Sequence, residues 1–196
     1  MAAVTIASAL RGVLDPSAPE PEVVGGVPAG VMVPVVAGPR PHLVLTRRTD
    51  RVRHHKGEIS FPGGVRHADD PDLLSTALRE TEEELGIAGD AFDVLGGLPP
   101  VHTIVSGYVI VPFVGILRGR PEVRPSPVEI DAVLELPVSA LDAAEREVLA
   151  TDGDGATRGW FAYEVDGHVV WGATGRIVHS FLEALRRSGW SPPKEG

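Results

Sequence analysis

Runs of apolar and β-branched residues mark the strands expected in this chain. Two such runs, residues 29–36 and 42–46, flank the sequence GPRP and predict a hairpin. Further strands are expected at residues 59–61, 92–98, 108–117, 130–136, 158–165 and 168–171. The last two should form a second hairpin that turns at Asp166 and Gly167. The run 108–117 lacks clean alternation of apolar and polar residues, so we expect it to be buried on both faces.

Four segments are expected to be helical. The best defined one runs from Pro71 to Leu85, and Gly86 suits the left-handed position that closes a helix. The others are expected at residues 1–13, 139–147 and 174–187. Strands that are followed by helices favour an α/β sandwich. We expect an N-terminal helix and extended arm at 1–28, one domain at 29–188 and a flexible tail at 189–196.

Composition and charge narrow the classes of function. A chain of 196 residues is long enough for one domain with a substantial core. The formal charge of −9 argues against a nucleic-acid-binding protein, because such proteins carry a basic face. The chain has no cysteine, which excludes disulfides, thiolate metal sites and a cysteine nucleophile. Its start lacks the pattern of a signal peptide and no run approaches 18 apolar residues, so we expect a cytoplasmic protein without a membrane span.

The helix expected at residues 71–85 carries three carboxylates on one face. At about 100° per residue, Glu80, Glu83 and Glu84 fall within a third of the helix circumference. Three like charges repel one another, and a divalent cation would remove that repulsion. Ligands that are all oxygen suit a hard ion such as Mg²⁺ or Mn²⁺. A solvated acidic helix face is the alternative interpretation.

The residues around this face resemble the signature of the Nudix hydrolases. That signature reads G, five residues, E, seven residues, R-E, an apolar residue, any residue, E-E, any residue, G and an apolar residue. The matching positions are Gly64, Arg79, Glu80, Glu83, Glu84, Gly86 and Ile87. The resemblance implies an α/β/α sandwich, with a mixed β-sheet between helices, and a metal-dependent diphosphatase acting on a small molecule.

The resemblance also implies roles for individual residues. Glu80, Glu83 and Glu84 would hold Mg²⁺ or Mn²⁺, and the Gly64 carbonyl would add a ligand because glycine allows close approach. Arg79 would support the site by pairing with a carboxylate. The general base is left open between Glu83 and Glu129, since a loop glutamate in the region of Glu129 reaches the site in some relatives.

Two positions depart from the signature. Asp70 stands where glutamate is usual, and eight residues rather than seven separate it from Arg79. Thr81 stands where an apolar residue is usual. Because Asp70 is followed by Pro71, we expect Asp70 to be the N-cap of the helix rather than a metal ligand.

A second stretch is similar to the motif that the coenzyme A diphosphatase branch carries upstream of its Nudix signature. It comprises LTRRT at 45–49 and RHHKGEISFPGG at 53–64, with Thr49 in place of a more usual serine. This implies cleavage of coenzyme A to 4′-phosphopantetheine and adenosine 3′,5′-bisphosphate. The basic residues of 47–56 suit phosphate oxygens, and the motif favours Arg48, Arg53 and His55 for that role. A solvated basic loop is the alternative interpretation.

Two other functions remain as alternatives. A Nudix enzyme could act on ADP-ribose, NADH or a nucleoside triphosphate, and a non-catalytic ligand sensor could share the fold. A sensor would be favoured by a degraded signature, whereas Arg79, Glu80, Glu83 and Glu84 are all present. The sequence leaves the oligomeric state open, with a homodimer as one option.

Overall fold

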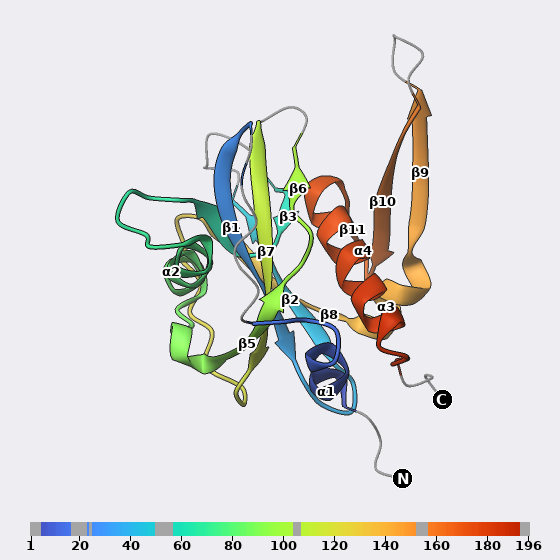
Figure 1. Ribbon diagram of the computed structural model, residues 1–196, viewed down its shortest axis with the longest axis horizontal. Coiled ribbons are helices and arrows are strands. Elements are labelled where there is room, and N and C mark those ends of the chain that lie inside the picture. Colours follow the sequence, from blue (N-terminus) through green and yellow to red (C-terminus); the bar gives the residue numbers. More distant parts are fainter. Residues whose placement is uncertain are drawn as a thin grey trace.

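A mixed β-sheet forms the centre of the molecule (Figure 1). The computed structural model describes residues 5–16, 23, 25–49, 57–103, 107–151 and 157–192. Within these, the main path of the sheet runs β3-β2-β1-β7-β5. Its strands are β1 (Val27–Val36), β2 (His42–Arg48), β3 (Ile59–Ser60), β4 (Gly63–Val65), β5 (Phe92–Gly97), β6 (Val101–His102), β7 (Tyr108–Leu117) and β8 (Ile130–Pro137). β1 and β7 are parallel, whereas β1 with β2, and β2 with β8, are antiparallel.

Helices cover both faces of this sheet, with α2 on one side and α4 on the other (Figure 1). The helices are α1 (Ile6–Arg11), α2 (Leu73–Leu85), α3 (Val138–Ala144) and α4 (Gly172–Arg187), and a 3₁₀ turn covers Gly89–Ala91. A smaller antiparallel sheet of β9 (Arg146–Thr151), β10 (Thr157–Val165) and β11 (His168–Val170) lies beyond α4. The expected mixed sheet between helices is therefore confirmed.

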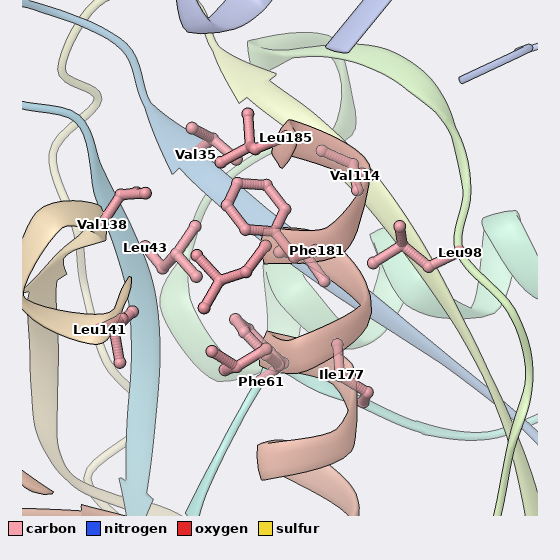
Figure 2. Packing of buried hydrophobic residues seen from close by; sticks show 14 of the residues in the cluster. Val35, Leu43, Phe61, Leu98, Val114, Val138, Leu141, Ile177, Phe181 and Leu185 are labelled. Carbon is pink, nitrogen blue, oxygen red and sulfur yellow. The ribbon is translucent and has the colours of Figure 1, made fainter. Parts of the chain in front are cut away.

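Side chains alternate between two hydrophobic clusters on the two faces of the sheet. On β1, Met32 packs in the cluster with α2, whereas Val33 and Val35 pack in the cluster with α4. Figure 2 shows the second cluster, in which Phe181 of α4 lies among residues of the sheet and of α3. β7 is mostly buried from Val109 onward, as its lack of alternation predicts. Successive side chains of a strand point to opposite faces of the sheet, so one strand contributes to both clusters.

Most of the expected elements form, although several helices begin or end at other residues than expected: the helix expected at 1–13 covers Ile6–Arg11, with residues 1–4 outside the described ones, and α2 begins at Leu73. Both predicted hairpins are present, the second turning at Asp166 and Gly167. The helix expected at 139–147 instead covers Val138–Ala144, and Arg146–Thr151 becomes strand β9. Pairing with β10 decides this segment, and that is a long-range contact that local pattern does not reveal.

Helix α2 packs directly on β1 at Gly30. A Cβ atom at Gly30 would lie 2.1 Å from the carbonyl oxygen of Leu73, so only glycine permits this approach. The helix begins after Asp72, whose carboxylate accepts from the Ser75 N–H at 2.7 Å. It ends at Gly86 in the left-handed conformation, with φ of 68°. The expectation that Asp70 is the N-cap is therefore wrong.

No helix in the described part of the chain combines the length and apolar character needed to cross a membrane.

Replacing Gly30 with alanine should destabilise the protein by about 1–3 kcal/mol, because the added methyl group must displace α2 from β1. Gly38→Ala is the control, since no atom of the described residues lies within 4 Å of a Cβ atom there. The measurement is the free energy of unfolding from urea titration. Equal stabilities of the two variants would show that the close packing at Gly30 is not required.

Candidate active site

The three carboxylates of α2 that are expected to bind metal have different surroundings. The Glu84 side chain is 3% exposed and the Glu80 side chain 16%, whereas that of Glu83 is 58% exposed. Glu80 lies against the turn at Gly64, where a Cβ atom would be 2.5 Å from the carboxyl carbon of Glu80. The glycine therefore lets the backbone of β4 approach this carboxylate closely.

Arg79 links the acidic face to a buried aspartate. Its Nη1 donates to Glu80 at 2.8 Å and lies 3.3 Å from both carboxylate oxygens of Glu83. Its Nε and Nη2 donate to the two carboxylate oxygens of Asp70, each at 3.0 Å. The guanidinium group is therefore held on both sides, and its position determines the rotamers of the glutamates that it contacts.

Asp70 is the buried carboxylate that holds Arg79 in position. Its side chain is 8% exposed, and it also accepts from the His67 N–H and the Thr76 hydroxyl, both at 2.9 Å. The hydrogen bonds from Arg79 hold the pKa of Asp70 well below its usual value, although burial alone would raise it. Asp70 is thus an anchor for Arg79. The sequence did not indicate this partner, because residues 70–72 precede the helix and helical spacing does not apply to them.

Glu84 is a buried carboxylate with incomplete pairing. Arg48 Nη1 lies 3.3 Å from Glu84 Oε1, and Oε2 is buried without a hydrogen-bond partner among the described residues. The pKa of Glu84 is raised to about 8, mainly by burial; Arg48 lowers it, and the nearby charges of Glu80 and Glu129 also contribute to the rise. A buried carboxylate in this setting favours a cation close to it.

The loop before β8 brings Glu129 to Glu84. The Ser126 N–H donates to the Glu84 carbonyl at 2.9 Å, and the Arg124 N–H donates to the Leu85 carbonyl at 2.8 Å. The Glu129 carbonyl accepts from the Thr49 N–H at 2.8 Å. The segment is thereby attached both to the end of α2 and to the end of β2, so the Glu129 side chain approaches the acidic site.

The start of the predicted phosphate-binding segment also lies at this site. Arg48 contacts Glu84, and its backbone N–H donates to the Glu58 carbonyl at 3.0 Å. The neighbouring Arg47 points elsewhere and pairs with Asp131 at 2.6 Å. The two other predicted substrate-binding residues, Arg53 and His55, lie outside the described residues.

The carboxylate oxygens of the acidic face are donors that suit a hard divalent cation. In the described structure these side chains do not surround a single point. Among the described residues, no three acidic or histidine side chains lie close enough together to hold a metal ion. Arg79 instead occupies the space between Glu80 and Glu83, and Arg48 contacts Glu84. Glu84 Oε2 has no partner in the described part of the chain, and the Glu80 carboxylate lies against Gly64. Carboxylate oxygens are donors of the kind that Mg²⁺ and Mn²⁺ prefer.

Asp70→Asn should lower the free energy of unfolding by about 2 kcal/mol at pH 7, because it removes the charge that Arg79 contacts. Because the pKa of Asp70 is lower in the folded protein than in the unfolded chain, its ionised form stabilises the fold at pH values above its unfolded pKa of about 4. This stabilisation is lost as the pH falls below that value. The difference from the parent chain should therefore shrink in acid. Denaturant titrations in EDTA at several pH values measure it.

Asp72→Asn is the matched control for this prediction, since asparagine is as good an N-cap as aspartate and should change stability little. Equal losses from Asp70→Asn and Asp72→Asn would contradict the anchoring role of Asp70.

Comparison with known proteins places the chain in a family. The NUDIX domain matches residues 26–154. The protein described as "Uncharacterized Nudix hydrolase NudL" from Photorhabdus laumondii is 35% identical over 159 residues, which cover 81% of this chain and 84% of that protein. Its counterpart of the same name from Yersinia pestis is 35% identical over 158 residues, which cover 80% of this chain and 79% of that protein.

Solved structures share the fold at low sequence identity. A MutT/nudix family protein from Enterococcus faecalis superimposes with a TM-score of 0.56 at 14% identity, covering 86% of this chain and 66% of that one. A MutT protein from Methanosarcina mazei has a TM-score of 0.54 at 15% identity, covering 87% of this chain and 100% of that one. These likenesses show the fold. The family match and the NudL relatives establish that the chain belongs to the Nudix hydrolases, which act on phosphoric anhydride bonds.

Proposed function

We propose that this enzyme hydrolyses the diphosphate bond of coenzyme A and its derivatives, releasing 4′-phosphopantetheine and adenosine 3′,5′-bisphosphate. The observation that carries the proposal is the contact between Arg48 and Glu84. It joins the basic segment that resembles the coenzyme A diphosphatase motif to the acidic face of the Nudix signature. A phosphate bound by the segment would thus lie beside the acidic face.

The metal ligands in this proposal are Glu80, Glu83, Glu84 and the Gly64 carbonyl. Nudix enzymes generally use divalent cations, and a bound Mg²⁺ or Mn²⁺ would neutralise charge on the diphosphate and promote attack by water. Arg79 has a supporting role, because its hydrogen bonds to Glu80 and Glu83 orient those carboxylates.

We assign the general base to Glu129 rather than Glu83. Arg79 contacts both carboxylate oxygens of Glu83, so neither oxygen is free to accept a proton from water without losing that contact. Glu129 acts electrostatically on Glu84, so its carboxylate lies near the proposed metal ligands. Glu129 would take a proton from the attacking water while the bond between the bridging oxygen and the attacked phosphorus breaks.

Substrate recognition would come from the segment that follows β2. The Gly57 N–H donates to the Arg48 carbonyl at 3.2 Å, so the two described ends of this segment meet beside Glu84. The sequence between them includes Arg53 and His55. Guanidinium groups suit phosphate oxygens, and coenzyme A offers a 3′-phosphate in addition to its diphosphate.

The proposed metal ligands are tested by removing one charge at a time. Glu83→Gln and Glu84→Gln should each lower kcat by orders of magnitude, because each removes a charged ligand that acts on the transition state. Glu82→Gln is the control, since it removes an equal charge from an exposed position between Thr81 and Glu83. Turnover that persists in both variants, or in excess EDTA, would exclude the metal assignment.

The proposed substrate is tested by comparing kcat/KM values for coenzyme A, dephospho-coenzyme A, NADH and ADP-ribose. Coenzyme A should be preferred, and Arg48→Ala should reduce its preference over dephospho-coenzyme A by about ten- to a hundredfold. Arg47→Ala removes the same charge from a side chain that pairs with Asp131, and it should leave the preference unchanged.

The outcome of this panel separates the candidate substrates. Equal rates with coenzyme A and its dephospho form would show that the 3′-phosphate is not recognised. A clear preference for ADP-ribose or NADH would identify a Nudix enzyme for another nucleoside diphosphate derivative. Binding without turnover of any compound would identify a ligand sensor.

A further inference from the structure

The turn that carries Glu129 is largely exposed up to Ile130. Val128 is 67% exposed and Glu129 is half-buried, whereas Ile130 at the start of β8 is buried. Inside the turn, the N–H groups of Glu129 and Ile130 donate to the Ser126 carbonyl at 3.2 and 2.8 Å. Those two bonds define the shape of the turn, whereas its placement against the active site depends on bonds to other elements.

Bonds to two other elements fix that placement. At one end, the Ser126 N–H donates to the Glu84 carbonyl of α2. At the other end, Thr49 makes two bonds, because its N–H donates to the Glu129 carbonyl at 2.8 Å and its hydroxyl donates to the Val128 carbonyl at 2.9 Å. Thr49 is 9% exposed, and its hydroxyl bond to Val128 is partly buried.

Thr49 is also the residue that follows β2, directly after Arg48. It extends the pairing of β2 with β8 beyond Arg48 and Ile130, the last partners of that ladder. Replacing the Thr49 side chain with valine leaves the backbone donors and acceptors of these bonds in the chain. The hydroxyl bond to Val128 comes from a side chain, and it can therefore be removed without altering the backbone.

We propose that Thr49 is a positioning residue for the hydrolysis, whose hydroxyl holds the Val128–Glu129 turn so that the Glu129 carboxylate stays beside Glu84. The inference rests on the proposed function, since it takes Glu129 as the general base. A base must lie within hydrogen-bond reach of the water that it activates, and a displacement of about 1 Å costs up to about a hundredfold in rate.

The test compares Thr49→Val, which keeps the shape of the side chain but removes the hydroxyl, with Thr49→Ser, which keeps the hydroxyl. Thr49→Val should lower kcat by about ten- to a hundredfold with little change in KM, and Thr49→Ser should recover most of the loss. Thr46→Val is the matched control, because the buried Thr46 hydroxyl also donates to a backbone carbonyl, that of Ser60 at 3.2 Å, but away from this turn.

A double-mutant cycle separates positioning from general damage. If Thr49 acts through Glu129, Thr49→Val should cause almost no further loss of kcat in the Glu129→Gln background. Equal loss in both backgrounds would overturn the inference. Full turnover by Glu129→Gln would instead overturn the assignment of Glu129 as the general base in the proposed function. If Glu129→Gln has a low kcat but Thr49→Val has the kcat of the parent enzyme, only the inference about Thr49 is overturned.

Amide hydrogen exchange provides a readout that needs neither substrate nor metal. Thr49→Val should speed exchange at Ser126, Glu129 and Ile130 by about five- to tenfold, since the turn loses one attachment. Thr46→Val should leave these amides unchanged. Unaltered exchange in Thr49→Val would overturn the inference whatever the kinetics show.

Discussion

The active-site region depends on the balance of charge around the second half of α2. Glu80, Glu83 and Glu84 lie towards the C-terminal end of a helix, where the helix dipole is also unfavourable for negative charge. Asp70 and Glu129 add two further carboxylates. In the described structure the guanidinium groups of Arg79 and Arg48 offset this charge, and their placement decides which carboxylates are held and which remain available for a cation.

The two guanidinium groups have different supports. Arg79 is fixed by Asp70, which is buried and receives hydrogen bonds from two further groups, so its position is set within the Nudix signature itself. Arg48 comes from the end of β2 and connects the site to the segment proposed to bind substrate. One arginine thus orders the proposed metal ligands, while the other lies where a phosphate would approach them.

A second charged cluster, on the α4 side of the sheet, stabilises the fold. It consists of Glu145, Tyr163, His179 and Arg186. Burial alone would raise the pKa of Glu145, but hydrogen bonds from His179, Tyr163 and Arg186 hold it below its usual value. These partners join β10 and α4 to the end of α3, and Tyr163 is fully buried. The cluster stabilises the packing of the smaller sheet on α4, because each polar group there has a partner.

Local pattern in the sequence was sufficient for most strands, both hairpins, the acidic helix face and the closing Gly86, because these depend on side-chain period and backbone conformation over a few residues. Tertiary structure alone decided the rest. Asp70 became the partner of Arg79 instead of the helix cap, residues 146–151 became a strand, and Glu84 was buried while Glu83 stayed exposed. Each of these outcomes depends on contacts between segments that are distant along the chain or lie outside regular structure, where sequence spacing carries no geometric information.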